Sequence, residues 1–422
     1  MEFIASYGSM LVIIAAAVGF FMAYGIGAND VANAMGTSVG SKALTIKQAI
    51  IIAMIFEFAG AYLAGGEVTS TIRKGIIDAA PFADIPELMI LGMISALFAA
   101  GAWLLLASML GWPVSTTHSI IGAIIGFALV AVGSEAIQWG KVAGIVGSWV
   151  VTPAISGFIA YLIFMSAQKL IFDTDKPLNN AKRFVPLYMG LAGFVMSLVT
   201  IKKGLKHIGI NLGTFEGYAL AIGIAVLIGL IGKVVISRMK MDPNADKQMQ
   251  FNNVEKVFAV LMVLTACCMA FAHGSNDVAN AIGPLAAVVN IVENNGEMAK
   301  KAALAWWILP LGGLGIVVGL AVLGKKVIKT IGEGITHLTP SRGFAAELAA
   351  ASTVVIASGT GLPISTTQTL VGAVLGVGMA RGIAALNMGV IRNIVVSWVI
   401  TLPVGAALAI VIFYILRTAF GV

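Results

Sequence analysis

The sequence predicts an all-α polytopic membrane protein, and three observations carry the prediction. Of its 422 residues, 59% are hydrophobic and only 11% are charged, whereas a soluble domain is usually about one quarter charged. The mean hydropathy is +0.98. Apolar runs of roughly 20 residues, the length that a helix needs to cross a bilayer, recur along the whole chain. We therefore expect a multi-pass protein of the cell (plasma or inner) membrane, with the lipid bilayer as its surroundings.

About twelve hydrophobic segments are expected to form the helices. The first part of the chain contributes 9–27, 44–65, 88–110, 114–133 and 141–165, and two connecting spans follow at 184–201 and 216–236. The last part contributes 255–275, 302–323, 343–361, 364–380 and 389–416. Pro113 and Pro363 each stand just before a segment. Proline disfavours a continuous helix through its position, so those two segments are expected to be broken or re-entrant helices.

An internal repeat relates the two ends of the chain. Asn-Asp-Val-Ala-Asn-Ala occurs at 29–34 and again at 276–281, and Pro-x-Ser-Thr-Thr occurs at 113–117 and again at 363–367. The order is the same and the offset is nearly constant. We therefore divide the chain into a first repeat at 9–165, connecting spans and loops at 166–254, and a second repeat at 255–416. An odd number of spans separates equivalent positions, so the repeats should be inverted, as in secondary transporters.

The Asn-Asp motif is the first candidate site. On a helix, Asn29, Asp30 and Asn33 share one face, and Asn276, Asp277 and Asn280 do the same. Such side chains are costly inside a membrane unless a polar partner answers them. A single copy would favour simple hydrogen bonding between helices. The duplication, with an ionisable Asp each time, favours a ligand site.

The Pro-x-Ser-Thr-Thr motif predicts an anion site. A proline suits the first turn of a helix, and the free N–H groups and positive dipole end of that turn attract anions. Helix capping is the alternative. Two copies facing each other would enclose one tetrahedral oxyanion. The six hydroxyl residues concerned are Ser115, Thr116, Thr117, Ser365, Thr366 and Thr367.

Acidic residues constrain the mechanism. Glu57 and Glu347 lie in apolar segments, where carboxylates are functional candidates by default, and the repeated motifs contain no Lys or Arg. An anion could not settle beside these carboxylates without accompanying cations. Oxygen ligands suit an alkali cation better than a transition metal. The residues therefore predict cation-coupled anion uptake, with Na⁺ or H⁺ as the cation; His118 and His273 are expected to be hydrogen-bonding neighbours of the site or proton relays.

These motifs resemble those of the inorganic phosphate transporter (PiT) family of sodium- or proton-coupled phosphate symporters. The resemblance covers about three quarters of the chain. It implies an inverted-repeat transporter of orthophosphate, with Asn29, Asp30, Asn276 and Asp277 at the ion and phosphate site and with Glu57 and Glu347 tied to transport or cation coupling. The central region lacks the large insert that some members carry.

We therefore expect Na⁺-coupled phosphate symport by alternating access. Phosphate is assigned to the six hydroxyl residues together with Asn33 and Asn280, and Na⁺ to Asn29, Asp30, Asn276, Asp277, Glu57 and Glu347. Na⁺ is a transported ion and no cofactor is expected. The open alternatives are proton coupling, a permease for sulfate or another oxyanion, and an anion channel. An enzyme is not expected because no nucleophile–base pair or phosphate loop occurs, nucleic acid is not an expected partner, and the sequence is compatible with a homodimer.

Overall fold

The structure, a computed structural model, describes residues 2–202, 212–241, 247–297, 304–334, 338–382 and 388–422. In these ranges the chain is almost entirely helical, and its only β pairing is an isolated bridge between Ile77 and Ile137. The helices are α1 Glu2–Gly40, α2 Ile46–Ala64, α3 Gly66–Lys74, α4 Pro86–Leu110, α5 Thr116–Ala131, α6 Trp139–Ala167, α7 Pro177–Lys202, α8 Thr214–Ser237, α9 Lys247–Glu293, α10 Ile308–Gly334, α11 Pro340–Gly359, α12 Thr366–Arg381 and α13 Met388–Phe420.

The all-α prediction is confirmed. Each of the twelve predicted segments overlaps one helix, and the short α3 is additional. Among the described residues, nine helices are long and apolar enough to cross a membrane, which confirms the multi-pass membrane protein. The predicted segment 302–323 starts at two positions outside the described residues. The predicted connecting region 166–254 also includes 203–211 and 242–246, which lie outside them.

Two predicted spans were too short. The structure extends 9–27 to the 39-residue α1 and 255–275 to the 47-residue α9. The Asn-Asp motif lowers the local hydropathy, so both predicted spans ended near it. In the structure each helix continues through its motif because the polar side chains are buried against partners on other helices.

Helices α5 and α12 are the broken elements that the prolines predict. Each has 16 residues and is therefore about 24 Å long, less than the hydrocarbon thickness of about 30 Å. Each follows an irregular segment that contains the proline and comes after the end of α4 or α11. Two half-helices with their N-terminal ends inside the protein result.

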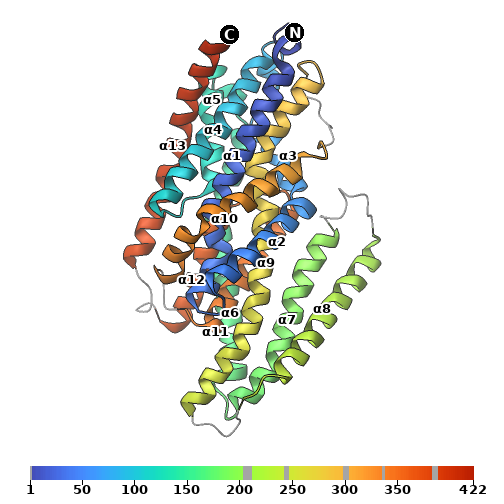
Figure 1. The fold of residues 1–422 in the computed structure, drawn as a ribbon, viewed down its shortest axis with the longest axis vertical. Coiled ribbons are helices and arrows are strands. Elements are labelled where there is room, and N and C mark those ends of the chain that lie inside the picture. The colour runs from blue at the N-terminus through green and yellow to red at the C-terminus, as the bar shows by residue number, and fades with distance from the viewer. Residues whose placement is uncertain (1, 203–211, 242–246, 298–303, 335–337, 383–387) are drawn as a thin grey trace.

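The long helices α1 and α9 run in opposite directions. Figure 1 shows α1 descending from the N-terminus and α9 rising from the lower end of the molecule. Residues near the start of α1 approach the end of α9, since a Cβ added at Gly8 would lie 2.9 Å from Val292. An inverted repeat requires this antiparallel pair. The inversion of the complete halves, and the boundaries 9–165, 166–254 and 255–416, stay predictions.

Glycines at the start of both motifs bring helices into backbone contact. A Cβ at Gly27 would lie 1.9 Å from the carbonyl oxygen of Ile316 on α10, and one at Gly274 would lie 2.1 Å from the carbonyl oxygen of Glu57 on α2. Real side chains do not approach this closely, so only glycine permits this packing. These contacts fix the position of each motif relative to the neighbouring helix, α10 for the first motif and α2 for the second.

Candidate binding site between the two motif pairs

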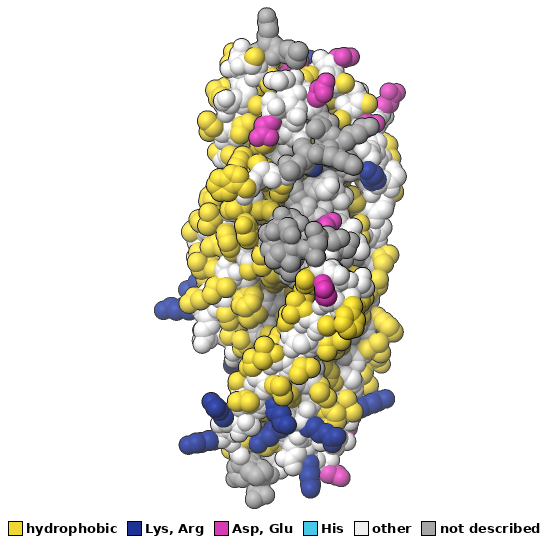
Figure 2. Space-filling view, turned by 90° about the vertical axis from the view of Figure 1, so that its right-hand side faces the viewer, with side chains coloured by type: hydrophobic (Ala, Val, Ile, Leu, Met, Phe, Trp, Pro, Cys, Tyr) yellow, Lys and Arg dark blue, Asp and Glu magenta, His cyan; other side chains and the backbone are white. Residues whose placement is uncertain are grey.

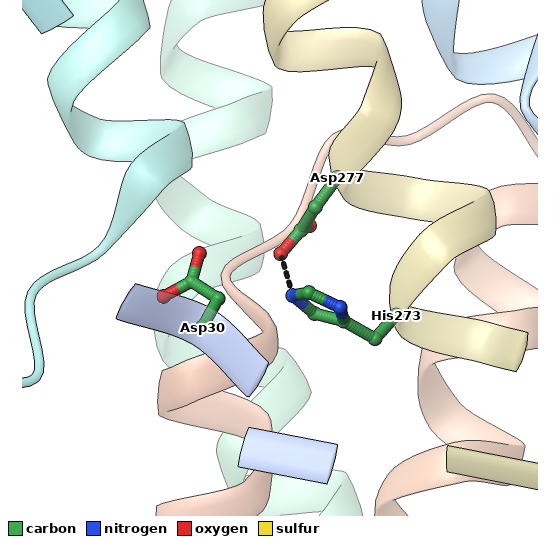
Figure 3. Close-up of side chains that lie close together, drawn as sticks. All are labelled: Asp30, His273 and Asp277. Carbon is green, nitrogen blue, oxygen red and sulfur yellow. Dashed lines mark ion pairs between the residues drawn. The ribbon is translucent and has the colours of Figure 1, made fainter. Parts of the chain in front are cut away.

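The two motif aspartates come from different helices and lie close together, beside His273 (Figure 3). Asp30 lies on α1, while Asp277 and His273 lie one turn apart on α9. One ligand atom from each of these three residues lies within 4.8 Å of the others. All three side chains are buried. Two carboxylates and an imidazole thus converge at one point in the protein interior.

The half-helices α5 and α12 begin beside this point. Ser115 caps α5 by accepting a hydrogen bond from the His118 N–H at 3.3 Å, and Ser365 caps α12 in the same way from the Gln368 N–H at 3.3 Å. Among the described residues, the N–H groups at 116, 117, 366 and 367 have no hydrogen-bond acceptor. Free N–H groups at a helix start form an anion-binding position.

The two motifs contact each other directly. Within each half, a threonine hydroxyl donates to the motif aspartate: Thr116 to Asp30, and Thr366 to Asp277 at 2.7 Å. Between the halves, an asparagine donates to a threonine: Asn33 to Thr367 at 2.7 Å, and Asn280 to Thr117 at 3.2 Å. Each of these four contacts has its symmetry counterpart among them. The four motif copies therefore form one polar cluster.

The first asparagine of each motif holds the segment before a half-helix. Asn29 donates to the carbonyl of Trp112 at 2.9 Å and accepts from the N–H of Val114 at 3.2 Å. The amide group of Asn276 lies 3.0 Å from the hydroxyl of Ser358, at the end of α11, and 3.3 Å from the carbonyl oxygen of Leu362, in the segment before α12. These side chains position the half-helices against α1 and α9.

Glu57 joins the cluster through His273. The imidazole Nδ1 lies 3.3 Å from a Glu57 oxygen, and Nε2 lies 3.0 Å from an Asp277 oxygen. The equivalent positions in the other half are apolar. Gly27 meets Ile316 as Gly274 meets Glu57, and Ile26 precedes Gly27 as His273 precedes Gly274. The cluster is thus symmetric in its motifs and asymmetric in this ion pair.

Glu347 lies in a separate polar group. It accepts hydrogen bonds from the hydroxyls of Thr37 at 2.5 Å, Ser38 at 2.6 Å and Thr265 at 2.7 Å. Thr37 follows Asp30 by about two helical turns, or roughly 10 Å along α1. The structure therefore does not bring Glu347 together with the other predicted sodium residues.

A family model described as the phosphate transporter family matches residues 26–409, which include every motif of the cluster. The chain belongs to the phosphate transporter family. It is 62% identical to a putative phosphate permease of Haemophilus influenzae over the full length of both chains, and 42% identical to the chloroplastic inorganic phosphate transporter 2-1 of Arabidopsis thaliana over 94% of this chain and 70% of that one. A solved structure titled the sodium-dependent phosphate transporter is 42% identical, with a TM-score of 0.89 over 97% of this chain and 99% of that chain.

The family membership confirms the resemblance recognised in the sequence and the expectation of a phosphate-family transporter rather than an enzyme. The activities in these names, putative phosphate permease, inorganic phosphate transporter and sodium-dependent phosphate transporter, describe the relatives. In this phosphate transporter, the ligand assigned to each site residue stays a prediction.

The cluster is closed on all sides in this structure of the transporter. The side chains of the Asn-Asp and Ser-Thr-Thr motifs are at most 2% exposed, and Glu57 and His273 are 0% exposed. The hydroxyl groups that were expected to hold phosphate are engaged with aspartate, asparagine and backbone partners. An ion can enter only if these contacts open.

Sequence reasoning missed several polar residues of the site. Ser108 contacts Asn29 as Ser358 contacts Asn276, and both belong to an Ala-Ser-x-x-Gly-x-Pro stretch that occurs at 107–113 and 357–363. That repeat was a usable signal. The hydroxyls around Glu347 have no such signal, because Thr37, Ser38 and Thr265 come from two distant segments.

Proposed function

We propose that this phosphate transporter performs Na⁺-coupled symport of inorganic phosphate by alternating access. The observation that carries the proposal is the direct contact between the carboxylate motifs and the half-helix ends. Thr116 and Thr366 each donate to the aspartate of their own half. A site that binds an anion and a site that binds cations would therefore share side chains.

Phosphate is assigned to the starts of α5 and α12. Their free N–H groups, the positive ends of their dipoles and the hydroxyls of Thr117 and Thr367 attract a tetrahedral oxyanion. The two half-helices start close together, since Thr117 donates to the carbonyl of Ile364, just before α12, at 2.8 Å. Phosphate would replace such contacts between the halves.

Na⁺ is assigned to the aspartates and to Glu57. A phosphate ion placed beside Asp30 and Asp277 meets strong repulsion in a buried site of low dielectric. Cations bound to the carboxylates remove that repulsion, so each ion needs the other. This mutual requirement is the physical basis of symport. Phosphate binds unfavourably while the carboxylates carry no cation, because the buried negative charges are not compensated.

Glu347 is assigned a second, separate cation role. Its carboxylate already accepts three hydroxyl donors, and hydroxyl and carboxylate oxygens are hard ligands suited to Na⁺. Its donor Thr37 lies about two helical turns beyond Asp30 along α1, which keeps Glu347 apart from the aspartate cluster. We assign it to cation coupling and not to phosphate binding.

The proposal of alternating access is supported by the burial of the cluster and by the antiparallel helices α1 and α9. A closed site releases an ion to one side only if helices move, and α5 and α12 are short elements joined to their neighbours by irregular segments. Inverted repeats provide two equivalent arrangements for such a movement. Figure 2 shows Lys and Arg gathered at the lower end of the molecule, and the positive-inside rule assigns that end to the cytoplasm. Both termini lie at the opposite end in Figure 1.

Proton coupling is the second candidate, and His273 favours it. The imidazole bridges Glu57 and Asp277, at 3.3 and 3.0 Å, and imidazole is the side chain best suited to exchange a proton near neutral pH. A proton held here would compensate carboxylate charge without a metal ion.

Proteoliposome uptake decides between these candidates. Labelled phosphate is supplied outside, first with an inward Na⁺ gradient and no pH gradient, and then with an acidic exterior and no Na⁺. Na⁺-coupled symport gives uptake in the first condition only. Uptake in the second condition alone would show that H⁺, and not Na⁺, is the coupling ion. Uptake that is as fast without either gradient as with one would indicate a channel.

A further inference from the structure

A cavity between α7 and α8, two helices long and apolar enough to cross a membrane, is a candidate second binding site. The cavity has a volume of about 680 Å³, within the range of ordinary ligand pockets. Its walls are mostly apolar, and three cationic residues, Lys182, Arg183 and Lys233, stand at one end. The cavity lies far from the transport cluster in the sequence, on the two helices that connect the repeats.

The cavity lies where α7 and α8 approach each other closely through small residues. A Cβ at Gly190 would lie 3.1 Å from the carbonyl oxygen of Ala225, and one at Gly229 would lie 3.2 Å from that of Pro186. Because glycine has no side chain, Gly190 and Gly229 leave the apolar part of the cavity, called the furrow below, open. Leu187, 65% exposed, and Leu230, 56% exposed, line it. These exposures place the furrow on the outer surface of the helix bundle.

The cations lie where helix ends meet polar loops. Lys182 and Arg183 are in the second turn of α7, and Lys233 is in the last two turns of α8. Within the described part of the chain, no carboxylate pairs with any of the three; the guanidinium of Arg183 lies 5.4 Å from the centre of the Phe184 ring. Figure 2, which faces this side of the molecule, shows Lys and Arg gathered at the lower end below a broad apolar surface.

We propose that this cavity binds one anionic phospholipid, with its headgroup on Lys182, Arg183 and Lys233 and an acyl chain in the furrow. A basic pocket between transmembrane helices at the membrane interface has the chemistry of an anionic lipid headgroup site. The apolar length of the cavity favours a lipid over free phosphate, which would leave the furrow empty. The site links the two connecting helices and is independent of the transported ions.

The test is native mass spectrometry of the full-length protein with phosphatidylglycerol and phosphatidylcholine at equal concentration. The wild type should retain phosphatidylglycerol selectively. Each cation beside an anionic headgroup contributes roughly a fivefold change in affinity, so K182Q/R183Q/K233Q should lower phosphatidylglycerol affinity by about a hundredfold. The matched control K169Q/K176Q/K240Q removes three exposed cations outside the cavity and should retain the lipid.

Two further arms separate a lipid site from other occupants. Leu187→Trp fills the furrow without changing charge and should weaken phosphatidylglycerol binding, whereas glycerol phosphate, a headgroup without chains, should not compete. Equal losses in the triple variant and its control would overturn the proposal, as would equal binding of both lipids. Competition by glycerol phosphate would indicate a simple anion site, and a dimer whose cross-links map to this furrow would assign the cavity to a second copy.

Discussion

Gly27→Ala should destabilise the protein and displace the first motif. The added methyl group would lie 1.9 Å from the carbonyl oxygen of Ile316, and a carbon needs well over 3 Å of separation from a non-bonded heavy atom. Helices α1 and α10 must therefore separate by at least about 1 Å. Overpacking of this kind typically costs about 1–3 kcal/mol, which matches or exceeds the gain of at most about 1 kcal/mol that alanine brings to a helix interior.

The assay compares thermal unfolding and phosphate uptake of Gly27→Ala with those of a matched glycine variant. Gly147 lies within α6, and a Cβ there meets nothing within 4 Å. Gly147→Ala should therefore be as stable as the wild type or slightly more stable, and should transport phosphate. Gly27→Ala should unfold at a lower temperature and lose most of its uptake. If both variants behave alike, the close contact between α1 and α10 does not position the motif.

Three further predictions concern the assigned roles. Asp30→Asn and Asp277→Asn should each raise the Na⁺ concentration for half-maximal uptake at least about tenfold, because unit charges 4 Å apart interact by about 4 kcal/mol at an effective dielectric constant of 20. Circular dichroism checks that both variants are folded. Wild-type Na⁺ dependence in both variants would argue against the assignment. Thr117→Val with Thr367→Val should raise the KM for phosphate severalfold while the Na⁺ dependence persists, and an unchanged KM would move phosphate elsewhere. Glu347→Gln leaves its hydroxyl donors without a carboxylate and should abolish the stimulation of uptake by Na⁺; full stimulation would make this residue structural.

Local sequence signals predicted the elements well. Apolar runs predicted all twelve segments, and Pro113 and Pro363 marked the starts of the two half-helices. A proline alone is not a sufficient signal, since Pro153, Pro186, Pro284 and Pro403 lie inside helices. The errors came where a local signal and the tertiary structure compete. The polar motifs lowered hydropathy within α1 and α9, but partners on other helices satisfy those side chains and let the helices continue.

The repeat carried most of the candidate site. Because each motif occurs twice, the sequence could associate Asp30 with Asp277 and one Ser-Thr-Thr stretch with the other, and the structure brings these four stretches together. Residues outside the repeat had no comparable signal. Glu57 and Glu347 were assigned the same cation role, yet Glu57 meets His273 whereas Glu347 meets three hydroxyls.

The sequence also could not show how the cation-binding and anion-binding motifs contact each other. The sequence separated a cation motif from an anion motif, but hydrogen bonds join the two, from Thr366 to Asp277 and from Asn33 to Thr367. Such contacts connect residues 89 and 334 positions apart. A pattern read along one chain cannot give distances across a folded bundle.

The most direct test of Na⁺-coupled phosphate symport is uptake of labelled phosphate into proteoliposomes with Na⁺ replaced by K⁺ or choline at a fixed pH on both sides. The carboxylate cluster around Asp30 and Asp277 predicts that uptake falls to the level of empty liposomes in both replacements and returns when Na⁺ is restored. Undiminished phosphate uptake in K⁺ and in choline would contradict Na⁺ coupling.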